Sequence, residues 1–239
     1  MSKLLIVFGF TLSCISMATF AYEYRIGVIE NPPHVFIKEG SPRGRAVEFM
    51  KAVINNSGSQ SSFFNIPIKR ALKLLKEGKL DALLPFEDSQ ETTSTLTKPL
   101  FKLVPGLCFR KEDFIPILSA THLFKDLKIG YTDGVELAEP LANSQARLIS
   151  LKGESALDRG LKMLQANRFD AFYHPNPIFL YHQNNPLSKQ VACSYFHGLS
   201  SNTYIAVSDK LSKEKLSHLE TSFSAAMDNQ SYTQFVNSY

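Results

Sequence analysis

The pattern of apolar and polar residues is nearly the same in two segments of the chain. In the first, residues 67–86 (PIKRALKLLKEGKLDALLPF), apolar side chains recur at the i, i+3, i+4 and i+7 spacing of a helix with one buried face. These are residues 68, 71, 72 and 75. Gly78 is expected to end the helix, because glycine readily adopts the left-handed backbone conformation that usually follows one. The apolar run 82–84 then predicts a buried strand, so the segment is half of a βαβ unit.

The second segment, residues 154–174 (ESALDRGLKMLQANRFDAFYH), has an apolar stripe at 157, 161 and 164. Asn167 takes the place of the glycine, and Asp170 precedes an apolar run at 171–173. Two such units about 90 residues apart predict two α/β lobes in one chain. The alternative is a coincidental repeat, because this pattern is common in α/β proteins.

Further elements are predicted around these units. Apolar runs predict strands at 24–29, 63–66, 127–131, 148–151 and 203–207. Helices are expected at 46–54, from Val135, at 179–182 and at 232–236. A longer helix is expected over the stripe 216, 219, 223 and 227, with Ser208 and Asp209 as its cap.

The first 21 residues have the pattern of a secretory signal peptide. Lys3 supplies the positive start, residues 4–12 form an apolar core, and residues 19–21 (TFA) fit a cleavage site. The apolar run is too short for a membrane span, which needs about 20 residues. Cys14 raises a lipoprotein alternative, but the preceding TLS is a poor lipobox. We therefore expect cleavage before Tyr22 and a periplasmic location.

Removing 21 residues from 239 leaves 218, enough for one large lobe or two small lobes with cores of their own. Removing Lys3 leaves 25 basic against 22 acidic residues, interspersed without a run of like charge. That balance gives no reason to expect nucleic-acid binding. Cys108 and Cys193 remain, and in an oxidising compartment they either form one disulfide or stay as two inert buried thiols.

Several segments together resemble the family 3 extracellular solute-binding proteins, the bilobal periplasmic receptors that deliver amino acids and similar polar solutes to ABC importers. In chain order these are RIGVIENPPHVF, RGRAVEFMKAV, RALKLLKEGKLDALL, TKPLFK, LKIGYTDG, LQANRFDAFY, YIAVSDK and a final tyrosine. The resemblance covers essentially the whole chain after the signal peptide.

The resemblance implies an α/β, type II periplasmic-binding-protein fold, in which each lobe is a mixed sheet flanked by helices and two hinge strands join the lobes. The first lobe would comprise 22–108 plus 202–239, and the second 109–201. A small polar ligand would bind in the cleft of a monomer. An ABC permease or a membrane sensor would then recognise the closed form.

Ligands of open α/β sheets bind beyond the carboxyl ends of the strands. Four predicted loops meet that description: 31–36, 85–88, 131–134 and 173–176. Their candidate residues for stacking or enclosing a ligand are His34, Phe36, Phe86, Tyr131 and Tyr173. Those for hydrogen bonding are Glu87, Asp88, Thr132, Asp133 and His174, and Arg70 could reach an anionic group.

Each candidate also has a purely structural alternative. His34 could pack against the two prolines before it, and Phe36 and Phe86 could be core residues. Asp133 could only cap the helix expected after it, and Arg70 could be a solvated first-turn arginine.

The sequence departs from the amino-acid receptors of this family at two positions. Those receptors clamp the α-carboxylate with an arginine in the loop after the third strand, but here residues 87–95 read EDSQETTST. They also carry an acidic residue just beyond the second lobe's Asp-Ala, where this chain has His174-Pro175-Asn176. The absence of both the arginine and the acidic residue indicates a ligand other than an α-amino acid. The acidic residues Glu87 and Asp88 favour a cationic or neutral polar solute.

The sequence has no G-x-S-x-G, H-E-x-x-H, C-x-x-C or P-loop motif, and its six histidines lack metal-ligand spacing. We therefore expect a binding protein with no cofactor and no metal, not an enzyme. One alternative is a cyclohexadienyl dehydratase-like enzyme on the same fold, with Glu87 or His174 as general acid. Such enzymes bind dicarboxylates and need cleft arginines, which residues 87–95 lack. Another is an orphan or sensor-coupled receptor.

Overall fold

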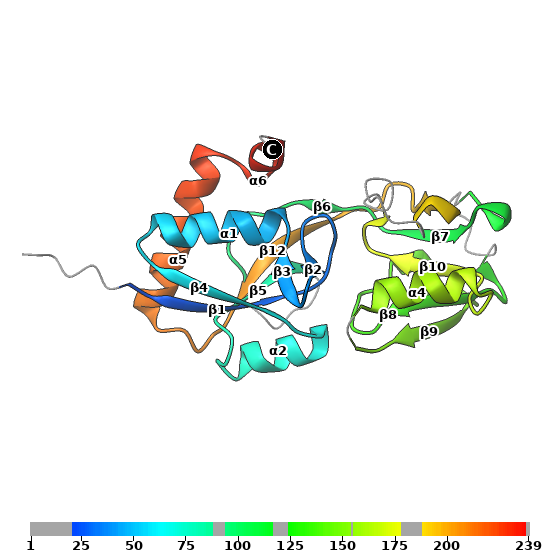
Figure 1. The fold of residues 1–239 in the computed structure, drawn as a ribbon, viewed down its shortest axis with the longest axis horizontal. Helices are drawn as coiled ribbons and strands as arrows, with labels where there is room; N and C mark the ends of the chain where they lie inside the picture. Colours follow the sequence, from blue (N-terminus) through cyan, green and yellow to red (C-terminus); the bar gives the residue numbers. More distant parts are fainter. Residues whose placement is uncertain (1–20, 88–93, 117–123, 154, 178–187, 238–239) are drawn as a thin grey trace, which may run out of the picture.

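The structure is a computed structural model, and it describes residues 21–87, 94–116, 124–153, 155–177 and 188–237 (Figure 1). The predicted signal peptide, Asp88 and the helix predicted at 179–182 lie outside this part of the chain, apart from Ala21. Two five-stranded sheets, each covered by helices, make a mixed α/β fold of two lobes. No helix within the described residues is long and apolar enough to cross a membrane.

The first lobe is built on a sheet with strand order β4-β1-β5-β12-β6. Its strands are β1 (Glu23–Val28), β4 (Gln60–Asn65), β5 (Ala82–Glu87), β6 (Lys102–Leu103) and β12 (Ser201–Val207). β1 runs parallel to β4 and β5, whereas β12 is antiparallel to β5 and β6. The three parallel strands therefore end at one edge of the sheet.

Helices cover both faces of the first sheet. Helix α1 (Arg45–Asn56), helix α5 (Lys213–Asn229) and helix α6 (Tyr232–Asn237) share one apolar core with it, and α2 (Ile68–Lys76) packs in a second cluster against β5. Figure 1 shows α1 and α2 on opposite sides of the sheet. A short hairpin, β2 (Phe36–Lys38) and β3 (Ser41–Arg43), lies between β1 and α1 in the chain.

The second lobe is built on a sheet with strand order β11-β7-β10-β8-β9. Its strands are β7 (Gly106–Arg110), β8 (Lys128–Thr132), β9 (Arg147–Leu151), β10 (Ala171–His174) and β11 (Val191–Tyr195). Helix α3 (Glu139–Ala142), helix α4 (Ala156–Gln165) and the 3₁₀ turns η1 (Lys111–Asp113) and η4 (Ser188–Gln190) complete it. α4 packs on one face, while α3 contributes Leu141 to a separate apolar cluster.

The chain passes between the two sheets twice, from β6 to β7 and from β11 to β12 (Figure 1). All of β7, from Gly106, belongs to the second sheet, so that sheet begins slightly before the boundary at residue 108 expected from the sequence. The wider division into 22–108 plus 202–239 and 109–201 stays a prediction. Cys108 and Cys193 face each other on paired strands and form a disulfide, which resolves the two alternatives left open by the sequence.

The two repeated units fold as predicted. Helix α2 is followed by Gly78 at φ 71°, and helix α4 by Asn167 at φ 55°, so both residues take the left-handed conformation that ends a helix. Strands β5 and β10 follow directly. Asparagine tolerates this conformation better than most residues with a Cβ, which explains why it can replace glycine here.

Two predicted helix starts are wrong. The helix expected from Val135 begins only at Glu139, where Pro140 in the first turn fits a helix start that needs no backbone donor. The long helix α5 is capped by Ser212, whose Oγ accepts a hydrogen bond from the Lys215 backbone N–H at 3.2 Å. Ser208 instead donates from its hydroxyl to a carbonyl at the end of α2.

Candidate functional site

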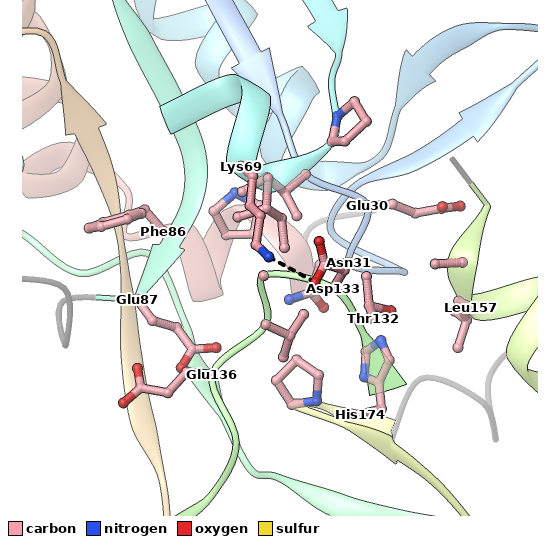
Figure 2. A pocket seen from close by; sticks show the side chains of 18 of the residues that line it. Glu30, Asn31, Lys69, Phe86, Glu87, Thr132, Asp133, Glu136, Leu157 and His174 are labelled. Carbon is pink, nitrogen blue, oxygen red and sulfur yellow. Dashed lines mark hydrogen bonds and ion pairs between the residues drawn. The ribbon is translucent and has the colours of Figure 1, made fainter. Parts of the chain in front are cut away.

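A cavity of about 140 Å³ lies where the strand ends of the two sheets meet (Figure 2). From the first lobe, the residues after β1, between β4 and α2, and at the end of β5 line it. From the second lobe, the residues at the end of β8, before and at the start of α4, and at the end of β10 line it. The site thus occupies the place where ligands of open α/β sheets bind.

Five of the predicted site residues line this cavity. They are Phe86, Glu87, Thr132, Asp133 and His174. The loops after β5, β8 and β10 are therefore brought together as expected, although whether these residues touch a ligand stays a prediction. Asp88 lies outside the described residues.

Another five predicted residues do not line this cavity. They are His34, Phe36, Arg70, Tyr131 and Tyr173. Arg70 is exposed on α2, Phe36 belongs to the β2–β3 hairpin, and Tyr131 is half-buried in β8.

His34 is part of the first lobe's packing. Its ring stacks on Phe101 with centroids 3.6 Å apart, and its Nδ1 lies 2.6 Å from the Tyr232 hydroxyl oxygen. Burial lowers the pKa of His34 to about 4, so the ring is neutral near pH 7. Its partners lie 67 and 198 residues away in the sequence, which local pattern could not reveal.

Tyr173 does not line the main cavity but supports a segment that does. Its hydroxyl donates to the Glu136 carbonyl and accepts from the Ala138 backbone N–H, both at 3.1 Å. These bonds hold the irregular segment between β8 and α3. Tyr173 also lines a second cavity adjoining the first, and Glu87 and Glu136 line both.

An ion pair crosses the cleft between the lobes. The Nζ of Lys69, in the first turn of α2, lies 2.9 Å from the Oδ1 of Asp133, which follows β8 (Figure 2). Asp133 makes no helix cap, since the next helix starts at Glu139. The sequence analysis predicted Arg70 and not its neighbour Lys69 as a cleft residue. The apolar stripe of α2 shows which face of the helix is buried, but not which polar side chain points toward the other lobe.

Glu87 is the most perturbed acid of the cavity. It ends β5, is partly buried, and accepts a hydrogen bond from the Ser201 hydroxyl at 3.4 Å. Burial, together with the negative charge of nearby Glu136, raises the pKa of Glu87 to about 7. Figure 2 shows the two side chains next to each other, one from each lobe.

Glu30 and Asn31 also line the cavity, together with the predicted residue His174. Asn31, with only 5% of its surface exposed, has a buried Oδ1 that finds no hydrogen-bond partner among the described residues. Burial also raises the pKa of Glu30, with a further contribution from Asp158. His174 accepts from the Asn176 backbone N–H at its Nδ1, and burial lowers its pKa to about 3, so the neutral ring carries its proton on Nε2.

The described lining is rich in carboxylates. Glu30, Glu87, Asp133 and Glu136 are its acids, and Lys69 is its one basic side chain. No arginine belongs to the lining in the parts of the chain that the structure describes. Within the same parts, no group of three or more histidine, cysteine, aspartate or glutamate side chains could hold a metal ion.

No protein-family model and no curated protein matches the sequence. Solved structures match along nearly the whole chain, and they show that the protein has the type II periplasmic-binding-protein fold. The ligand-binding core of GluR0 in complex with L-glutamate superposes with a TM-score of 0.72 at 17% identity, covering 91% of this chain and 97% of that one.

Two further structures show the same fold. The amino acid ABC transporter substrate-binding protein AbpA from Streptococcus pneumoniae, bound to L-arginine, matches at 16% identity and a TM-score of 0.71, over 90% of this chain and 93% of its own. The ancestral amino acid-binding protein AncCDT-1, a precursor of cyclohexadienyl dehydratase, matches at 16% identity and a TM-score of 0.72, over 91% and 94%.

Proposed function

We propose that this protein is a periplasmic solute-binding protein that captures a small polar solute in the cleft between its lobes. The observation that carries the proposal is the cavity itself, because strand ends and loops of both lobes line it. A ligand there would contact both lobes at once and favour the closed arrangement by its differential contacts. The fold similarity to substrate-binding proteins of amino acid ABC transporters supports this function.

The protein would act as a monomer after removal of its signal peptide, and it would deliver its solute to an ABC permease. A membrane-bound sensor that reads the closed form is the alternative partner. Free α-amino acids fit the described lining poorly, because it offers no arginine to clamp a carboxylate and its lysine is already paired with Asp133.

One observation favours an enzymatic alternative. A carboxyl with a pKa of about 7, such as that of Glu87, is suited to general acid catalysis at neutral pH. The fold similarity to a precursor of cyclohexadienyl dehydratase points the same way. Against it, a dicarboxylate substrate would meet four acidic side chains and no arginine among the described lining residues. Formation of an aromatic product from a cyclohexadienyl substrate, followed by ultraviolet absorbance, would favour the enzyme.

The direct test is a ligand screen followed by scattering. The processed protein is screened by thermal shift against amino acids, polyamines, sugars, peptides and organic acids, where a ligand at 100 times its dissociation constant adds about 2.7 kcal/mol of stability. Small-angle X-ray scattering with the best ligand should then show a smaller radius of gyration. An unchanged radius at saturating ligand would contradict closure of the cleft.

A further inference from the structure

Two glutamates from different lobes face each other across the cleft. Glu87 ends β5 in the first lobe, and Glu136 lies between β8 and α3 in the second (Figure 2). Both line the main cavity and the cavity that adjoins it. The negative charge of Glu136 acts on Glu87, which places the two carboxylates within effective electrostatic range.

The backbone of each glutamate contacts neighbouring elements of its own lobe. Glu87 pairs with Thr203 in the β5–β12 ladder. The carbonyl of Glu136 accepts a hydrogen bond from the buried hydroxyl of Tyr173. The separation of the two glutamates therefore depends on the angle between the lobes, and a ligand between them would contact both lobes.

A second, independent feature of the same cavity is a buried oxygen that lacks a hydrogen-bond donor within the described parts of the chain. The Oδ1 of Asn31 is buried without a hydrogen-bond partner among the described residues, which is costly unless a ligand or water supplies one. Lys69 is engaged with Asp133 at 2.9 Å. The Asn31 amide oxygen is therefore a buried acceptor at which a ligand donor could bind.

We propose that the cleft takes a cationic amine or guanidine whose charged group lies between Glu87 and Glu136, with Asn31 accepting a further hydrogen bond. This rests on the proposed solute-binding function and names the class of its ligand. Ammonium and guanidinium groups carry several N–H donors and a positive charge, which matches two carboxylates and an amide oxygen. The ligand needs no carboxylate of its own, since the described lining offers no arginine to receive one.

Binding of such a cation is coupled to proton release. Among the described residues, the titratable groups that act on Glu87 are Glu136 and Tyr173. The other titratable groups of the described lining are Glu30, the Lys69–Asp133 pair and His174, which stays neutral between pH 5.5 and 8. A bound cation favours the ionised form of Glu87, whereas acid keeps it protonated. Affinity should therefore rise with pH, by about 30-fold between pH 5.5 and 8 if Glu87 titrates near 7.

The test is isothermal titration calorimetry on the processed protein at pH 5.5 and 8, with agmatine, putrescine, spermidine, L-arginine and L-citrulline as probes. L-Arginine and L-citrulline differ in charge at nearly constant shape, and agmatine lacks the carboxylate of L-arginine. The variants are Glu87→Gln and Glu136→Gln. The control is Glu220→Gln, the same charge change on an exposed position of α5.

We expect at least one cationic probe to bind, more tightly at pH 8, while L-citrulline binds weakly or not at all. Each cleft variant should weaken the cationic probe at least about 10-fold, since it removes one partner of a partly buried charge pair, and the control should change it less than about twofold. Variants that bind this probe as wild type does would overturn the cation site.

Two other outcomes separate the cation site from the function on which it rests. Binding and compaction with a neutral or anionic solute, with no cationic probe bound, would overturn the cation site and leave the solute-binding function standing. No binding and no compaction with any solute class would overturn both.

Discussion

Replacing Glu87 with glutamine should stabilise the protein, and by an amount that depends on pH. Glutamine keeps the shape of the side chain and removes its ionisation. In the folded protein the pKa of Glu87 is raised from 4.5 to about 7 by burial and by Glu136, whereas in the unfolded chain it has its ordinary value. The folded state therefore holds its proton more tightly than the unfolded state does.

The sign of the effect follows from this difference. The contribution of wild-type Glu87 to stability is fully present below about pH 4.5 and is lost as pH rises to about 7, because the folded state must then bury a charge beside Glu136. A shift of this size is worth about 3 kcal/mol, an upper limit because water in the cleft screens the charge. Glu87→Gln should thus gain up to about 3 kcal/mol at pH 8 and less than about 1 kcal/mol at pH 5.

The assay is urea unfolding of both proteins, compared pairwise at pH 5 and pH 8. The two proteins must be compared at each pH, because other groups also make the stability of both proteins depend on pH. Burial lowers the pKa values of His34 and His174, so their contribution to the free energy of unfolding is lost as pH falls below 6.5, opposite in direction to that of Glu87. Thermal unfolding is a second readout: at about 2–4 °C per kcal/mol for a chain of this size, the gain at pH 8 is a rise in melting temperature on the order of 10 °C. An equal difference between the two proteins at both pH values would refute the reasoning.

Three further changes test other features of the fold. Asp133→Asn removes the ion pair that joins the two lobes across the cleft. Because Lys69 is mostly exposed, ligand affinity measured by calorimetry should fall no more than about fivefold, and about 0.5 M salt should abolish the difference from wild type. A larger loss of affinity that persists in salt would contradict a screened pair. Cys193→Ser opens the 85-residue loop closed by Cys108 and should cost up to about 4 kcal/mol in urea unfolding, with a reductant affecting wild type but not the variant. Gly160→Ala places a Cβ 2.2 Å from a phenylalanine ring carbon of β10 and should cost about 1–3 kcal/mol; unchanged thermal stability would show that the ring moves freely.

The parts of the fold that the sequence predicts best are those decided within about 20 residues. The two helix–strand units carry their own apolar stripes and their own stop residues, Gly78 and Asn167, and both stops adopt positive φ. The helix expected at Val135 failed although its correction was also local. Pro140 marks a first helical turn and would have moved the start to Glu139.

The candidate site could be predicted only as a set of loops. Topology places the ends of parallel strands at one edge, so Glu87, Asp133 and His174 could be chosen without coordinates. The choice between Lys69 and Arg70 could not, because adjacent residues on a helix point about 100° apart and only the angle between the lobes decides which one crosses the cleft. Glu136 was also missed, because only the arrangement of the two lobes brings it next to Glu87 of the other lobe.

The overall charge of the chain and the charge of its cleft have opposite signs. The chain carries a formal charge of +4, whereas the charged side chains of the described cavity lining are four carboxylates and one lysine. At physiological salt, screening over about 8 Å leaves the exposed basic residues little influence on a distant ligand, but it weakens the partly buried glutamates much less. Attraction for a cation therefore acts mainly once the ligand is inside and both lobes contact it. Selectivity should then reside in the rate at which the closed complex dissociates, because an encounter governed by a weakly positive exterior gives cationic and neutral solutes similar association rates.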